Sequence, residues 1–140
     1  MKLKINIKNT SLIFSALLML TIWTSCSKDQ PVDEDGLLIT SRSECYVSNF
    51  ELLGSDFVTV RTKTAAIDTL AQTIKVEVRN GTDLKNLYPQ FTLITDAKLD
   101  PKIPGKVDFS DLANPKVWTV ISGNRQVKKP YTVYITVQPR

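Results

Sequence analysis

The chain of 140 residues contains no histidine, and this removes several kinds of active site at once. Ser-His-Asp and Cys-His nucleophile pairs, imidazole general bases and His-ligated zinc all need that side chain. Cysteine is nearly as scarce, with only Cys26 and Cys45. The five glycines are scattered beside turn residues, so no glycine-rich loop can hold a phosphate. The sequence therefore predicts a protein that is not an enzyme and that uses no metal or cofactor.

Carboxylates are the catalytic groups that remain. Four of them fall close together in sequence: Asp96, Asp100, Asp108 and Asp111. Such a group could supply the acid and base of glycoside hydrolysis, or oxygen ligands for calcium. Three lysines are interleaved with them and would oppose a dication, and the spacing lacks the regular loop of a calcium motif. We expect solvated loop charges here, with Asp108 capping a turn.

Long apolar runs are limited to Leu12–Ile22, near the start of the chain. Three lysines and no acid precede this run. Trp23 follows it, and two small residues then stand directly before Cys26. A basic start, a short apolar centre and a small-residue end are typical of a secretory signal, and the run is shorter than the about 20 residues that a membrane span needs. The cysteine position predicts a lipoprotein signal over 1–25 with acylation of Cys26. Trp23 departs from the usual aliphatic residue, and the alternative is an ordinary secreted protein that keeps the thiol.

The residues after the cysteine predict where the protein lies. Ser27-Lys28-Asp29 and then Asp33-Glu34-Asp35 follow Cys26. They resemble the short charged tracts that follow the lipidated cysteine in Bacteroidetes proteins sent to the outer face of the outer membrane. We therefore expect a surface-exposed outer-membrane protein, attached to the lipid bilayer by its N-terminus and followed by an acidic tether over 26–38. Lipid on Cys26 leaves Cys45 without a partner, as a small buried side chain.

Charge gives no support for a nucleic-acid partner. The intact chain carries a net charge of +4, but three of its 18 basic residues lie in the predicted signal. The remainder has 15 basic residues against 14 acidic ones, and no basic cluster with interleaved aromatics occurs. We predict that the protein binds no nucleic acid.

The segment 39–140 has the pattern of an all-β domain. Apolar and polar residues alternate over 74–78 and 131–137, and 116–121 is rich in β-formers. Weaker strand candidates are 46–52, 57–61, 65–70, 91–95 and 107–109. Residues 83–88 predict a single helical turn, capped by Thr82 or Asp83. Because no crossover helix is present, we predict an antiparallel β-sandwich of about seven strands.

Eight short pieces of this segment occur in an order that resembles a family of Ig-like β-sandwich modules in Bacteroidetes surface lipoproteins of glycan-utilisation systems. The pieces are Thr73–Val78, Gly81–Leu84, Leu87–Pro89, Phe91–Leu93, Ala97–Pro101, Val107–Ser110, Trp118–Val120 and Tyr131–Val133. The resemblance implies an Ig-like fold with Tyr131 and Trp118 as inner-face anchors. The chain departs from the family by stopping after one module. The resemblance implies a non-catalytic spacer or protein-interaction module, and alternatively a small glycan-binding lipoprotein.

Few residues are candidates for a binding or modification site. Tyr134 on the outer face of the last strand, and Tyr88 in a turn, are candidate glycan contacts, since a flat ring can stack on a sugar. Trp118 is either core or binding platform, because its strand is apolar on both faces. Thr69 lies in Asp68-Thr69-Leu70, which matches the O-glycosylation pattern of exported Bacteroidetes proteins. The expected partners are the bilayer and either a glycan or another surface protein.

Overall fold

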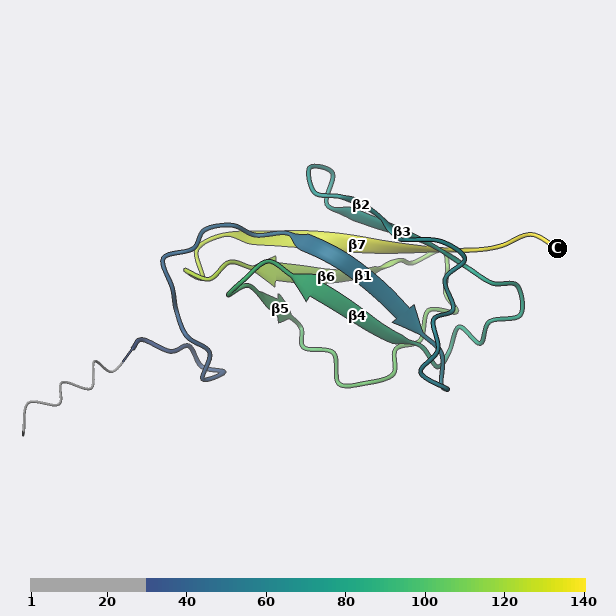
Figure 1. Ribbon diagram of the computed structural model, residues 1–140, viewed down its shortest axis with the longest axis horizontal. Helices are drawn as coiled ribbons and strands as arrows, with labels where there is room; N and C mark the ends of the chain where they lie inside the picture. Colours follow the sequence, from purple (N-terminus) through teal and green to yellow (C-terminus); the bar gives the residue numbers. More distant parts are fainter. Residues whose placement is uncertain (1–29) are drawn as a thin grey trace, which may run out of the picture. The chain divides into compact units, whose positions relative to one another are not determined.

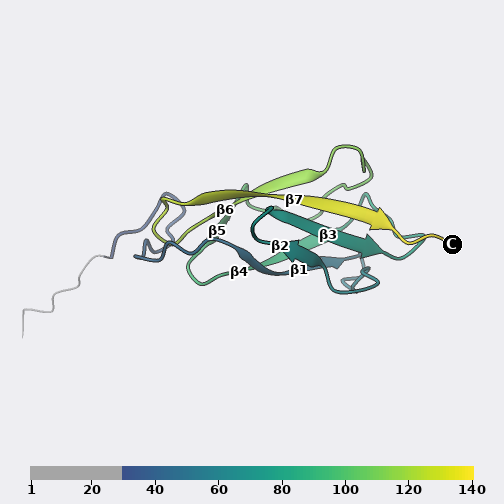
Figure 2. The same cartoon turned by 90° about the horizontal axis from the view of Figure 1, so that it is seen from above.

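The computed structural model describes residues 30–140, and within them the chain forms seven β-strands and no helix. The strands are β1 (Val47–Leu53), β2 (Ala66–Asp68), β3 (Thr73–Val78), β4 (Tyr88–Leu93), β5 (Lys98–Asp100), β6 (Lys116–Ile121) and β7 (Lys128–Val137). They build a two-stranded sheet, β1-β4, and a five-stranded sheet in the order β2-β3-β7-β6-β5. The two sheets lie as two layers (Figures 1 and 2). The predicted all-β sandwich is confirmed.

The core lies between the two sheets and is built from alternating side chains. In β3, Ile74, Val76 and Val78 are buried while the residues between them face outward, as the period of a half-buried strand requires. Tyr131 and Trp118 are both buried, at 0% and 5% exposure, so the two predicted anchors are core residues.

One strand pair differs from the antiparallel arrangement that we expected. β3 and β7 pair in parallel, with Ile74 opposite Val133 and Val76 opposite Ile135. A parallel pair needs a crossover connection, which is usually a helix. Here residues 79–127 make the crossover through β4 in the other sheet and then through β5 and β6. The absence of helices therefore did not exclude a parallel pair.

Other local predictions also need correction. The predicted helical turn over 83–88 is a turn and not a helix. Asp83 does cap it, accepting a hydrogen bond from the Lys85 N–H (3.0 Å), and Leu87 is fully buried beneath it. Segments 57–61 and 107–109 form isolated bridges rather than strands. β5 was not predicted, because three residues between turns carry too short an alternation.

Residues 31–39 fold into a short turn-containing segment, called here the N-terminal hairpin, that belongs to the folded unit (Figure 1). Val32 pairs with Leu38 in an antiparallel bridge. Asp33 closes the turn by accepting hydrogen bonds from the backbone N–H groups of Asp35 (3.0 Å) and Leu37 (2.9 Å).

Three cations hold the acids of the N-terminal hairpin. The Asp33 carboxylate, only 6% exposed, lies 2.8 Å from Lys98 Nζ and 2.9 Å from Arg125 Nε. Asp35 contacts Lys98 and Lys102 at 2.8 and 2.7 Å. The bond from Lys98 is the main cause that holds the pKa of Asp33 well below its ordinary value, and Asp33 in turn raises the pKa of Lys98.

Further contacts attach the hairpin and the residues after it to the sheet. Arg125 donates to the Leu38 carbonyl oxygen at 3.1 Å, and the Thr40 N–H donates to the Gly123 carbonyl oxygen at 3.0 Å. The folded unit thus begins at Pro31, and the described part of the predicted 26–38 tether is packed rather than loose, because its acids find cations on the sheet. The predicted signal over 1–25 and Cys26 lie outside the described residues.

Candidate functional site

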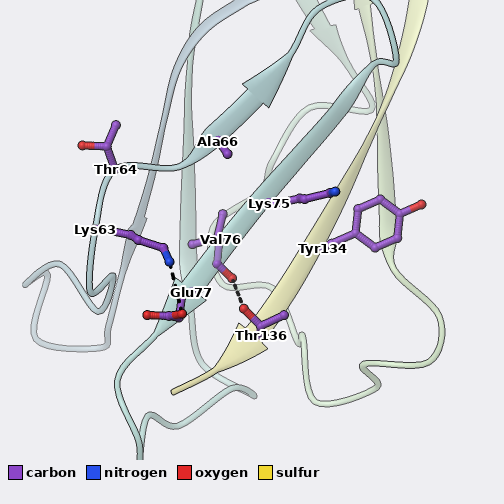
Figure 3. A pocket seen from close by; sticks show the side chains of 8 residues that line it. All are labelled: Lys63, Thr64, Ala66, Lys75, Val76, Glu77, Tyr134 and Thr136. Atoms are coloured by element: carbon purple, nitrogen blue, oxygen red, sulfur yellow. Dashed lines mark hydrogen bonds and ion pairs between the residues drawn. The ribbon is translucent and has the colours of Figure 1, made fainter. Parts of the chain in front are cut away.

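An open groove lies on the outer face of the five-stranded sheet, across β2, β3 and β7 (Figure 3). The strand register places Ala66 opposite Lys75, and Lys75 opposite Tyr134, so these three side chains form a row across the sheet. Ala66 carries only a methyl group, which leaves space at the β2 end of the row. The groove has a volume of about 500 Å³ and is lined by Lys63, Thr64, Ala66, Lys75, Val76, Glu77, Tyr134 and Thr136.

Tyr134 supplies the aromatic surface of the groove. Its side chain lies on the outward face of β7, between the inward-facing Val133 and Ile135, and is 41% exposed. Lys75 lies beside it in the parallel register and is also exposed (Figure 3). A flat ring next to an ammonium group can stack on a sugar face while the cation binds a hydroxyl or a carboxylate.

Glu77 is the acidic member of the groove and is already engaged. Its carboxylate accepts hydrogen bonds from Thr62 Oγ1 (2.5 Å) and Lys63 Nζ (3.3 Å). The Thr62 hydroxyl is the main cause that lowers the pKa of Glu77, with Lys63 second. The Thr136 hydroxyl donates to the Val76 carbonyl oxygen at 3.3 Å. Sequence reasoning placed Lys75 and Glu77 on a wet face but could not join them to Tyr134, because the parallel pairing was not predicted.

Tyr88, the second candidate glycan contact, is not near this groove in the fold, because it begins β4 in the opposite sheet. Its ring stacks on Phe57, with 4.7 Å between centroids and 28° between planes. Lys106 Nζ lies 6.0 Å from the Tyr88 centroid. Phe57 is 64% exposed and was missed by sequence reasoning. The structure therefore separates the two predicted tyrosines into two surface sites.

Trp118 belongs to the core and is not a binding platform. It is 5% exposed, and its ring lies 5.3 Å from that of Phe91 and 6.1 Å from that of Phe109. Aromatic pairs at these separations contribute packing energy beyond simple area burial. The pattern of its strand left open whether Trp118 is a core residue or a binding platform, and its burial shows that it is a core residue.

The clustered aspartates do not converge on a common centre. Asp96 pairs with Arg42 at 3.2 Å, while Asp108 and Asp111 accept backbone N–H groups of their own turns. Among the residues that the structure describes, no group of three or more acidic or thiol side chains could hold a metal ion. Asp96 is thus an ion-pair partner, and Asp108 and Asp111 cap turns, as expected for Asp108.

Two smaller predictions can be located. Cys45 is buried, with its thiol 3.0 Å from the Val120 carbonyl oxygen, and burial raises its pKa. Thr69 lies exposed in the turn between β2 and β3, where the Asp68 carboxylate accepts the N–H groups of Leu70 and Ala71. Modification of Thr69 stays a prediction, as does acylation of Cys26.

No curated protein sequence matches the chain. Within residues 30–140, no helix has the length and apolar character needed to cross a membrane. Three solved structures from Bacteroides species are similar. A candidate glycoside hydrolase from Bacteroides thetaiotaomicron matches with a TM-score of 0.58 and 30% identity over 69% of this chain, which spans only 26% of that protein.

The other two structures share the fold alone. A candidate secreted protein from Bacteroides fragilis has a TM-score of 0.50 and 14% identity, over 69% of this chain and 97% of its own. A DUF4623 family protein from Bacteroides eggerthii has a TM-score of 0.51 and 18% identity, over 69% and 22%. The family described as SGBP, N-terminal, matches residues 55–135, which is more than half of the chain. The protein therefore belongs to the SGBP N-terminal family, in agreement with the resemblance found in its sequence.

Proposed function

We propose that the protein is a non-catalytic outer-membrane surface lipoprotein, and that its Ig-like sandwich serves as a spacer or protein-interaction module in glycan utilisation. Family membership supports the link to glycans. The observation that carries the spacer role is the placement of the two ends of the folded unit. The N-terminal hairpin lies at the end of the sandwich where β7 begins, and the C-terminus lies at the opposite end of the long axis (Figures 1 and 2).

A spacer holds what it connects at a fixed distance only if both of its terminal segments are firmly attached to the folded domain. At one end, Asp33 is held by Lys98 and Arg125 in a largely buried ion network. At the other end, β7 is paired along β3 as far as Val137, and the Gln138 N–H donates to the Val78 carbonyl oxygen at 2.8 Å. Both attachments favour a rigid strut over a module that swings on its own termini.

The spacer role is tested by a distance measurement along the long axis. Spin labels at Glu34→Cys and Gln138→Cys should give one narrow distance distribution, because both ends are attached to the sheets. Only these two sites take the label, because Cys45 is buried and the proposed acyl group occupies the sulfur of Cys26. Lys98→Met should broaden that distribution, because Asp33 then keeps only Arg125 of its two cations. The matched control is Lys63→Met, which removes an exposed lysine that pairs with Glu77 on the sheet face. A broad distribution in the unmodified chain refutes the strut, whereas a distribution as narrow in Lys98→Met as in Lys63→Met refutes the attachment of the hairpin through Lys98.

Membrane attachment and surface exposure need their own test. The mass of the protein purified from membranes should include a diacyl or triacyl group on Cys26. Protease added to intact cells should then remove the folded unit. Cleavage of the signal at another bond, or full protection from protease, would contradict the surface-lipoprotein role.

A second candidate function is glycan binding at the groove beside Tyr134. The exposed ring, the neighbouring Lys75 and a volume of about 500 Å³ together favour it. Affinity electrophoresis in gels that contain host or dietary polysaccharides tests this role. Retardation that is lost in Tyr134→Ala but kept in Tyr88→Ala would support the groove. No retardation on any polysaccharide removes this candidate and leaves the spacer.

A further inference from the structure

The N-terminal hairpin presents apolar side chains to solvent at the end of the domain where the chain enters. Val32 is 57% exposed, Leu37 44% and Leu38 41%. Val32 and Leu38 are directly opposed in the antiparallel bridge, so their side chains lie next to each other on one face. Isolated exposed apolar residues are ordinary, but three within seven residues form a patch that calls for a partner.

The patch continues into a groove of about 340 Å³ between the edge strands of the two sheets. Leu37 lines this groove together with Phe91 and Leu93 of β4, and with Leu99 and Ile103 on the β5 side; the rest of the lining is Ala97, Lys98 and Lys102. Phe91, Leu93, Leu99 and Ile103 are partly buried and pack against the core. The apolar surface is therefore broader than the hairpin alone.

The hairpin is also the most acidic part of the domain, but most of its charge is neutralised internally. Asp33 is buried against Lys98 and Arg125, and Asp35 pairs with Lys98 and Lys102. Glu34 is the most exposed of the three acids, with its side chain 89% exposed and its Oε1 atom 3.6 Å from Lys98 Nζ. The ion network removes the cost of bringing two carboxylates to a low-dielectric surface, and it leaves the apolar side chains as the main outward feature.

Chain length decides which partner can reach this patch. Val32 follows Cys26 by six residues, which span at most about 20 Å when fully extended. If Cys26 carries lipid, as the proposed function requires, the patch is never farther than that from the point of insertion. A contact made over such a short linker is intramolecular, so weak apolar burial is enough to hold it.

We infer that the hairpin patch of Val32, Leu37 and Leu38 rests on the membrane interface. This inference depends on the lipid anchor of the proposed function. It sets the orientation of the module: the hairpin end lies against the bilayer, and the end that bears the C-terminus points outward (Figure 1).

Quenching by lipid tests the contact. The acylated full chain is reconstituted in vesicles of phosphatidylethanolamine and phosphatidylglycerol that contain brominated phosphatidylcholine. A bimane label at Leu38→Cys should lose at least twofold more emission to the bromolipid than the same label at Leu70→Cys. Leu70 is the matched control, because it is 93% exposed and lies in the β2–β3 turn.

A second variant separates apolar contact from mere proximity. A label at Glu34→Cys should be quenched in the unmodified background and should lose most of that quenching in Val32→Ser/Leu38→Ser, whose substitutions are at exposed positions. A Glu34 label that is quenched equally in both backgrounds would contradict a membrane contact made by the apolar side chains.

Each remaining outcome overturns the inference in a distinguishable way. A chain shown by mass to be acylated, with a Leu38 label quenched no more than the Leu70 label, overturns the membrane contact alone. A chain without acyl groups overturns the anchor and the contact together. A Leu38 label that becomes shielded without vesicles as protein concentration rises identifies a second copy of the chain as the partner instead.

Discussion

Gly123 offers the sharpest test of how the start of the folded unit is attached. It is buried, and it lies where the segment after the N-terminal hairpin crosses the loop between β6 and β7. A Cβ atom added at this glycine would overlap Thr40 Oγ1, and it would lie 2.9 Å from Asp96 Cβ and 3.3 Å from Arg42 Cβ. Two of these three neighbours belong to the segment that attaches the hairpin.

The expected loss follows from these contacts. Ordinary carbon contacts are about 3.5–4.0 Å, and forcing extra atoms into a packed site costs about 1–3 kcal/mol. Displacing Thr40 also breaks the hydrogen bond from its N–H to the Gly123 carbonyl oxygen, which contributes about 0.5–1.5 kcal/mol net. Gly123→Ala should therefore lower the free energy of unfolding by about 2–4 kcal/mol, and Tm by on the order of 10 °C.

Urea unfolding followed by the emission of buried Trp118 measures this loss. Thr40→Ala removes the nearest atom and should restore part of the stability in the Gly123→Ala background, with a coupling of at least about 0.5 kcal/mol in the double-mutant cycle. Asp96 Cβ remains, so the rescue should be incomplete. A Gly123→Ala protein within about 0.5 kcal/mol of the unmodified chain, or two strictly additive losses, would refute the packing described for this segment.

Three further predictions concern single side chains. Because the pKa of Asp33 is lowered in the folded state, its contribution to stability is complete above its ordinary pKa of about 4 and declines as pH falls below that value. Asp33→Asn should thus be less stable at neutral pH and lose less stability between pH 6 and 3 in urea titrations; parallel pH profiles would contradict the ion network. The Cys45 thiol is 3% exposed with a raised pKa, so iodoacetamide should modify it only in denaturant, and rapid native alkylation would contradict its burial. If exposed Thr69 is O-glycosylated, the mass of the exported protein should exceed that of its polypeptide with the acyl groups on Cys26, and Thr69→Ala should remove this further excess; a mass that the polypeptide and its acyl groups fully explain excludes the site.

Local alternation made much of the fold predictable. Lys116–Ile121 is a strand with the bounds that we expected, and Ile74, Val76 and Val78 face the core as their period of two requires. Asp108 caps its turn through the Ser110 N–H at 2.8 Å, as the turn chemistry indicated. Each of these properties depends on residues within a few positions of one another.

Pairing between distant segments was not predictable in the same way. Nothing near Lys75 in sequence indicates that it lies beside Tyr134, because that contact requires the parallel pairing of β3 with β7. Phe57 likewise gains significance only from its stacking on Tyr88. The candidate groove and the exposed aromatic pair could therefore not be predicted from the sequence, because both depend on the order of strands in the sheets.

The sequence by itself determined the all-β class, the family and the absence of histidine chemistry, since composition and alternation need no partner segment. Only the tertiary structure decided that Trp118 is core, that the Tyr134 groove exists and that the acidic hairpin is packed. The physical reason is the same in each case. Burial and charge pairing are properties of neighbours in space, and Asp33 found its cations at Lys98 and Arg125, far along the chain.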